Sequence, residues 1–172
     1  PTLPRLEGRE PAAARRAPAR GLSAGLGVLP DFRLTAVTSA SQRPLSRADL
    51  AGRPWIADFI FASCGGPCPL LSASMSRLQG RLPPAVRLVS FTVDPDRDTP
   101  KALKAYARRF RADPSRWYFL TGDKKPLYRL LREGFKLAAV EDPGAPSGLR
   151  VSHSTKFVMV DARGLLRGYY DR

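Results

Sequence analysis

The residues best suited to chemistry are two cysteines in the run Cys64-Gly65-Gly66-Pro67-Cys68, the only two in the 172-residue chain. The pattern places Cys68 at the N-terminus of a helix, where free backbone amides and the helix dipole stabilise a thiolate and lower the thiol pKa. Cys64 lies on the glycine-containing loop before that helix, from which its sulfur can reach the same point. Two sulfurs that meet there suit a soft metal ion or a redox disulfide.

Two other roles for the cysteine pair are weaker on chemical grounds. A structural disulfide between them would close a very short loop, and the entropic gain from such a loop is small. A catalytic zinc site could use two cysteines, one histidine and an open position, but no motif in the chain places a glutamate as its general base.

The elements on either side of the loop indicate how the cysteines are held. Residues 55–61 form an apolar run of strand length with aromatic and β-branched side chains, typical of a buried central strand. Pro69 suits the first turn of the following helix, where no amide donor is needed. The apolar stripe of that helix has helical spacing and consists of Leu71, Met75, Leu78 and Leu82.

The rest of the globular region alternates strands with helices. Residues 32–37 alternate like an edge strand, and residues 44–50 indicate a short helical turn. Further strands are expected at 86–93, 117–120, 155–160 and 165–170; helices are expected after Thr99 and Asp123, the second ending at Gly134, and a loop at 138–148. This order predicts an α/β fold with a central mixed β-sheet flanked by helices.

Charge and composition divide the chain into two parts. Residues 1–30 are rich in Pro, Ala, Arg and Gly without apolar periodicity, and predict a flexible basic linker or tail, whereas residues 31–172 predict one domain. The net charge of +14 favours an anionic membrane surface or an acidic protein partner. No nucleic acid partner is predicted, because no nucleic-acid motif accompanies the basic residues.

Four motifs, in this order along the chain, resemble those of the Sco/SenC family, and the resemblance covers roughly residues 29–170. The motifs are Phe61-Ala62-Ser63-Cys64-x-x-x-Cys68-Pro69, Val93-Asp94-Pro95-Asp96-Arg97-Asp98-Thr99-Pro100, Trp117-Tyr118-Phe119-Leu120-Thr121-Gly122, and His153 before an apolar strand that ends Val160-Asp161-x-x-Gly164. The resemblance implies a thioredoxin-like fold. It also implies a copper-binding metallochaperone that helps to assemble the binuclear copper centre of cytochrome c oxidase.

In that family two cysteines and a histidine bind copper, which carries over to Cys64, Cys68 and His153. Two thiolates and one imidazole suit Cu(I) and, with an added ligand, Cu(II). Asp94, after the second predicted buried strand, is expected to orient a ligand or to temper the thiolate charge, whereas Asp96 and Asp98 are interpreted as turn and cap residues. The implied partner is the apo copper-site subunit of the oxidase or another copper or thiol protein.

The resemblance also implies a place in the cell. Such proteins lie outside the cytoplasm, so we expect this chain on the periplasmic side of the inner membrane, tethered by an N-terminal segment upstream of Pro1. Relatives usually continue beyond the last hairpin into another helix. The given sequence stops at Arg172, right after that hairpin, so we expect either that the chain is trimmed or that one face of the sheet is less covered.

One departure from the family pattern keeps an enzymatic alternative open. Family members commonly carry Pro-Asp after the first cysteine, but here Gly65-Gly66 follows, so the run is closer to the Cys-Gly-Pro-Cys of thioredoxin. The alternative function is therefore a thiol-disulfide oxidoreductase that reduces the cysteines of the oxidase copper site or of another extracytoplasmic target through Cys64 and Cys68. Such enzymes place a cis-proline opposite the dithiol, where this chain has His153, and this difference favours copper. A peroxidase is a weaker third class, because the cysteine spacing does not resemble theirs.

Overall fold

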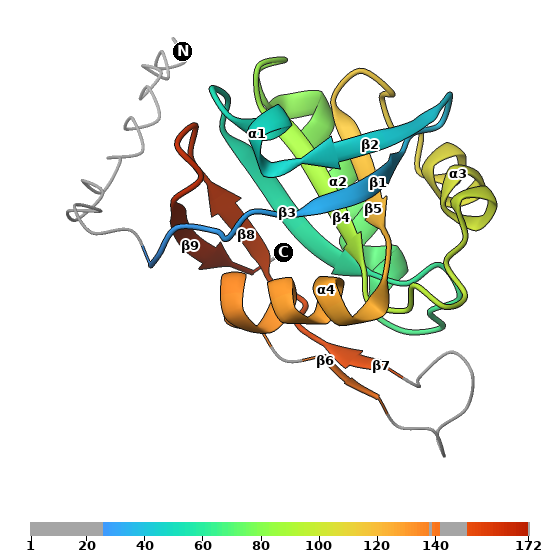
Figure 1. Cartoon of the computed structure of the whole chain (residues 1–172). Helices are drawn as coiled ribbons and strands as arrows, with labels where there is room; N and C mark the ends of the chain where they lie inside the picture. The colour runs from blue at the N-terminus through green and yellow to red at the C-terminus, as the bar shows by residue number, and fades with distance from the viewer. Residues whose placement is uncertain (1–25, 138, 142–150, 172) are drawn as a thin grey trace, which may run out of the picture.

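The computed structural model describes residues 26–137, 139–141 and 151–171, and for residues 139–141 and 151–153 it describes the backbone alone. The strands are β1 (Arg33–Val37), β2 (Gln42–Ser46), β3 (Trp55–Ile60), β4 (Arg87–Thr92), β5 (Trp117–Thr121), β6 (Ala139–Glu141), β7 (Val151–His153), β8 (Phe157–Val160) and β9 (Leu166–Tyr170) (Figure 1). The helices are α1 (Arg47–Leu50), α2 (Cys68–Arg81), α3 (Pro100–Arg109), α4 (Lys124–Arg129) and the π-helical turn η1 (Leu130–Gly134).

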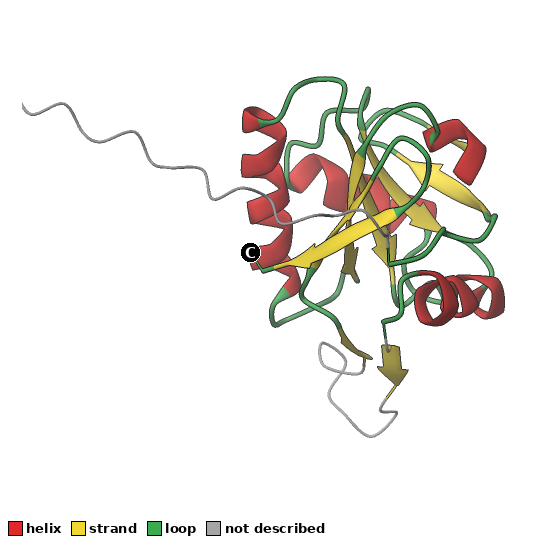
Figure 2. Cartoon of the chain, turned by 90° about the vertical axis from the view of Figure 1, so that its left-hand side faces the viewer, coloured by secondary structure: helices red, strands yellow, loops and turns green. Residues whose placement is uncertain are grey.

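The predicted mixed sheet is confirmed. Seven strands pair in the order β2-β1-β5-β4-β3-β8-β9, with β3, β4 and β5 parallel and the remaining neighbours antiparallel. Figure 2 shows the sheet between two layers, with the long helix α2 on one face and α4 on the other. A hydrogen bond between the hydroxyls of Ser72 and Tyr106, and one from the Ser76 hydroxyl to the Phe110 carbonyl, join α2 to the α3 region on the same face. This arrangement is a thioredoxin-like fold.

The predicted helices begin where their capping residues indicate. Helix α3 begins at Pro100, and the Thr99 hydroxyl accepts a hydrogen bond from the amide of Ala102 at 3.3 Å. In α2 the stripe is confirmed, because Leu71 and Met75 are fully buried and Leu78 and Leu82 pack against the core. Among the described residues no helix is both long enough and apolar enough to cross a membrane.

Two predictions about the first half of the sheet were wrong. Strand β1 lies between β2 and β5, so it is not an edge strand. The edge strand at this side of the sheet is β2. The sequence did not predict it, because Gln42, Arg43 and Pro44 are polar or lack an amide hydrogen and are exposed. Such residues are tolerated at the edge of a sheet. The predicted helical turn is limited to α1.

Residues 26–30, predicted to belong to the tail, pack against the domain. Val28 forms an antiparallel bridge with Leu165, and the amide of Leu26 donates to the carbonyl of Leu166 at 2.9 Å. The side chain of Leu29 is 1% exposed and belongs to the core. The packed domain therefore begins before Asp31.

Aromatic side chains fill the core on the α4 side of the sheet. The ring of Phe135, just after η1, lies 5.1 Å from that of Phe59 and 5.0 Å from that of Phe91. Trp55 completes the cluster at 6.2 Å from Phe135. The cluster fixes β3 and β4 side by side, and the loops that follow these two strands carry the cysteines and the aspartates.

The segment predicted as a loop at 138–148 contains one strand of a separate hairpin. Strands β6 and β7 pair antiparallel, with Ala139 opposite His153. Residue 138 and residues 142–148 of the predicted loop lie outside the described residues. The hairpin brings the chain to the start of β8.

Candidate functional site

The two cysteines lie where a central strand passes into a helix. Strand β3 ends at Ile60, a loop follows, and α2 begins at Cys68 with Pro69 in its first turn, as predicted. Neither cysteine forms a disulfide. Cys64 is 9% exposed, and its sulfur accepts a hydrogen bond from the Gly66 amide at 3.4 Å. The side chains of the two cysteines are also hydrogen-bonded to each other, so the sulfurs meet as expected.

The predicted lowering of the Cys68 pKa is wrong. Cys68 does occupy the first residue of α2, but its side chain is 0% exposed. Burial raises the pKa of its thiol, and the hydrogen bond with Cys64 raises it further. Loss of hydration outweighs the helix dipole because a buried thiolate loses its solvent shell completely. The more accessible sulfur of the pair is that of Cys64.

A buried carboxylate holds the start of the cysteine loop. Asp98 is 1% exposed, and both its oxygens accept from the amide of Ala62, at 3.0 and 3.1 Å. The hydroxyl of Thr92, at the end of β4, donates to the same carboxylate. Burial raises the pKa of Asp98 to about 6, and the hydrogen bonds from Thr92 and Ala62 oppose the rise. Asp98 is therefore more than a turn residue, because it ties β4 to the backbone two residues before Cys64.

A second buried carboxylate, missed by the sequence reasoning, lies behind the cysteines. Asp58, in the middle of β3, is 0% exposed, and within the described residues neither of its oxygens has a hydrogen-bond partner of good geometry. Burial raises its pKa to about 7, and the Ser90 hydroxyl, opposite it in the register, offsets part of the rise. Its charge contributes to the raised pKa of Cys68. The available signal was a single acidic residue inside an apolar strand.

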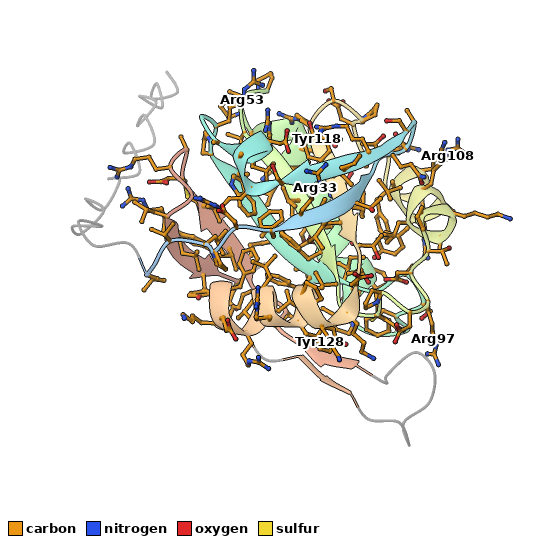
Figure 3. The ribbon with its side chains drawn as sticks, in the orientation of Figure 1. Arg33, Arg53, Arg97, Arg108, Tyr118 and Tyr128 are labelled. Atoms are coloured by element: carbon orange, nitrogen blue, oxygen red, sulfur yellow. The ribbon has the colours of Figure 1, made fainter. Side chains whose placement is uncertain are left out.

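Asp94 lies on the loop after β4, as predicted. It is 7% exposed, and its carboxylate lies 3.7 Å from the guanidinium of Arg97. The carbonyl of the preceding residue, Val93, accepts from the hydroxyl of Tyr128 in α4 at 2.7 Å. Figure 3 shows Arg97 and Tyr128 at the same end of the molecule as the β6–β7 hairpin. Asp94 thus places a largely buried carboxyl group at the carboxyl end of the parallel strands.

The backbone of His153 reaches that same end. Strand β8 is antiparallel to β3, with Ala57 opposite Val158, so β8 starts at the carboxyl end of β3, where the cysteine loop begins. His153 ends β7, and three residues separate it from the start of β8. The sequence suggested that His153 leads directly into the next strand, but in the structure it belongs to β7. Its side chain lies outside the described residues, so its role as a ligand stays a prediction.

The described side chains that could bind a metal at this site are the two cysteine thiols. Among the described side chains, no group of three His, Cys, Asp or Glu is gathered as a metal site. The described part of the site is a pair of adjacent reduced sulfurs, and such soft donors fit Cu(I) or exchange with a disulfide. The fold and this pair define a thioredoxin-like dithiol protein.

Comparison with known proteins places the chain within that class. The family model of SCO1/SenC matches residues 25–172. A SCO1 protein homolog of Bacillus subtilis is 36% identical over 130 residues, which are 73% of this chain and 66% of the relative. The chain thus spans slightly less than two thirds of that relative's length. The chain belongs to the SCO1/SenC family.

Solved structures agree with this assignment. A SCO1/SenC family lipoprotein from Bacillus anthracis is 32% identical, with a TM-score of 0.74 over 88% of this chain and 89% of that one. ScoI of Bradyrhizobium japonicum, solved with copper bound, has a TM-score of 0.69 over 84% of this chain and 90% of that one. At 21% identity this second likeness shows the fold alone.

Proposed function

We propose that this chain binds copper through Cys64, Cys68 and His153 and delivers it to the apo copper-site subunit of cytochrome c oxidase during assembly. The observation that carries the proposal is the pair of reduced, interacting thiols at the end of the sheet where the backbone of the chain's only histidine arrives. Membership in the SCO1/SenC family supports it.

The chemistry of these donors suits transfer. Copper displaces a proton from each thiol when it binds, and two thiolates with one imidazole leave the metal open to a further ligand from the acceptor. The partial exposure of Cys64 supplies the side from which an acceptor thiolate can enter. Asp94 would orient a ligand close to the site, with its own charge offset by Arg97.

The proposed location is the periplasmic side of the inner membrane, with a tether upstream of the domain. The lipoprotein nature of the Bacillus anthracis relative supports a tether. The charge of +14 supports contact with an anionic membrane or an acidic acceptor.

The proposal is tested by anaerobic titration of the reduced protein with Cu(I) against a competing chelator. We expect one equivalent to bind tightly, and His153→Ala or Cys64→Ser to weaken binding by about 100-fold or more, because each removes a direct ligand. Asp96→Ala, which removes an exposed carboxylate from the neighbouring loop, serves as the control and should leave the affinity unchanged. Weak binding by the wild type, or no effect of His153→Ala, would contradict the three-ligand site.

The adjacency of the sulfurs also favours a second function, that of a thiol-disulfide oxidoreductase. In this reaction the Cys64 thiolate attacks a target disulfide and forms a mixed disulfide. Cys68 then displaces the target thiolate, so the target is reduced by two electrons and a Cys64–Cys68 disulfide forms. The structure favours Cys64 as the attacking residue because Cys68 is fully buried.

The two cysteines should differ in reactivity. In the single variants, alkylation of Cys64 in Cys68→Ser is expected to be at least about tenfold faster than alkylation of Cys68 in Cys64→Ser, because burial hinders access to Cys68 and raises its pKa. Iodoacetamide labelling at pH 8, followed by mass spectrometry, measures both rates. Faster labelling of Cys68 would instead indicate that its thiol has the low pKa predicted from its position at the helix N-terminus.

A further inference from the structure

Arginine gathers at one end of the sheet. Strands β3, β4 and β5 are parallel, with Trp55 opposite Arg87, so the segments that precede these strands lie side by side. The β8–β9 turn joins them, because the Gly52 amide donates to the Ala162 carbonyl at 2.9 Å. These segments, which we call the amino-end face, carry nine arginines and three aspartates and consist of residues 47–54, 81–87, 108–116 and 161–165. The amino-end face therefore has a large excess of positive charge.

The opposite end of the same strands is nearly neutral. The segments that follow β3, β4 and β5 carry four aspartates, two lysines and one arginine, and consist of residues 61–67, 93–99 and 122–125. The first of these segments is the cysteine loop, which has no charged side chain. Figure 3 shows Arg53 of the amino-end face and Arg97 of the loop after β4 at opposite ends of the molecule. Positive charge is thus concentrated at the end of the strands away from the cysteines.

Most arginines of the amino-end face have no acidic partner. Arg163 is paired with Asp161 at 3.7 Å, yet its side chain is 73% exposed. Arg87 donates to the backbone carbonyl of Asp49, whose carboxylate accepts from Ser46 instead. Within the part of the chain that the structure describes, no ion pair with a carboxylate is formed by Arg53, Arg81, Arg87, Arg108, Arg109 or Arg111. These guanidinium groups are available to an external anion.

Two exposed apolar side chains border the same face. Leu26 is 54% exposed and Val28 is 60% exposed. Val28 forms its bridge with Leu165, at the end of the β8–β9 turn, and the Leu29 amide donates to the Gly164 carbonyl at 3.1 Å. Apolar side chains beside arginines suit the boundary between water and lipid, because the apolar groups enter the headgroup layer while the guanidinium groups stay at its surface.

We propose that the amino-end face binds an anionic lipid bilayer, with Leu26 and Val28 in the headgroup layer and the arginines at lipid phosphates. Guanidinium groups on separate segments suit a plane of mobile headgroups, because each phosphate can move to the arginine that it contacts. An acidic protein is the poorer occupant, since a rigid partner needs a carboxylate fixed opposite each of these scattered groups. Residues 1–25, which carry five arginines and two glutamates, precede Leu26 in the sequence and so add positive charge at the same end.

This orientation turns the cysteines away from the lipid. The cysteine loop follows the carboxyl end of the six-residue strand β3, so it would lie about 20 Å farther from the bilayer than the amino-end face. A partner would then reach Cys64 from the aqueous side while the domain stays on the membrane. The inference deepens the proposed membrane location, because it states which end faces the lipid, and it does not depend on copper binding.

Sedimentation with lipid vesicles tests the proposal. The full chain is mixed with vesicles of equal parts phosphatidylglycerol and phosphatidylcholine, and vesicles of phosphatidylcholine alone are the neutral control. We expect binding to the anionic vesicles only, and Arg53→Glu with Arg163→Glu should weaken it at least about tenfold. Leu26→Ser with Val28→Ser should weaken it at least about threefold, because less apolar surface enters the headgroup layer.

A charge-matched variant separates binding by this face from general attraction. Lys101→Glu with Lys125→Glu makes the same change in net charge at the opposite end of the strands. It should weaken binding about twofold at most, because charges more than a Debye length from the lipid are screened. An equal loss in the two charge variants, or no binding of the wild type to anionic vesicles, would overturn the proposal. So would a soluble polyglutamate peptide that displaces the vesicles, because an acidic protein would then be the occupant.

A second measurement reports which end faces the lipid. A fluorophore is attached at Ala48→Cys in α1 or at Ser63→Cys in the cysteine loop, each combined with Cys64→Ser and Cys68→Ser, and nitroxide-labelled headgroups quench it. We expect stronger quenching at position 48 than at position 63. Equal quenching, or stronger quenching at position 63, would overturn the orientation. Cu(I) affinity should be unchanged in the charge variants, so a failure here is distinct from a failure of the copper function.

Discussion

Replacing Asp58 with asparagine is expected to remove a fall in folding stability that the wild type shows between about pH 4 and pH 7. The pKa of Asp58 is raised from 3.8 to about 7 by burial, so the native state binds its proton more tightly than the unfolded state does. The contribution of protonated Asp58 to the free energy of unfolding is therefore fully present below about pH 4 and is lost as the pH rises to about 7. A shift of this size corresponds to a change on the order of 4 kcal/mol in the free energy of unfolding.

Urea denaturation of the reduced, metal-free protein from pH 4.5 to pH 8.5 measures this effect. Asp58→Asn should flatten most of the decline, so its stability relative to the wild type should increase with pH. A smaller decline should remain, because the pKa of Asp98 is also raised by burial and acts with the same sign. Asp96→Asn, at an exposed position, should follow the wild-type curve. An undiminished decline in Asp58→Asn would show that Asp58 is not the group responsible.

Removal of the Asp98 side chain is the second change with a large expected effect. In Asp98→Ala the amide of Ala62 and the hydroxyl of Thr92 lose their acceptor. A buried donor left without a partner costs about 1–3 kcal/mol, so we expect a loss of about 3 kcal/mol in the free energy of unfolding at pH 7. The start of the cysteine loop should also become mobile, because this carboxylate ties it to β4.

Two measurements separate the local effect from the global one. Hydrogen exchange of the segment from Ala62 to Cys68 should increase more than exchange in α3, and urea denaturation gives the overall loss. Asp96→Ala removes a neighbouring carboxylate that is exposed and should change stability by less than about 0.5 kcal/mol. If exchange of the loop is unchanged in Asp98→Ala, the carboxylate does not hold it in place.

Much of the fold could be predicted because local patterns and burial agreed. The apolar run of β3 and the stripe of α2 each have one periodicity, and Thr99 and Pro100 mark a helix start whatever the surroundings. Strand β2 could not be predicted, because Gln42, Arg43 and Pro44 form a strand only through pairing with β1. Strand β2 is stabilised by its pairing with β1, and the local sequence of residues 42–46 does not indicate that pairing.

The same division holds for the site. By itself the sequence determined that two cysteines meet at the N-terminus of a helix, because both are encoded within one short turn. Only the tertiary structure decided that Cys68 is buried and that its pKa is raised, because its solvation depends on α2 packing against the sheet. Tertiary structure also brought Asp98 to Ala62 and Asp58 behind the cysteines. The contact of Asp98 with Ala62 joins residues 36 positions apart in the chain, and the register of β3 against β4, which no local sequence pattern specifies, sets it.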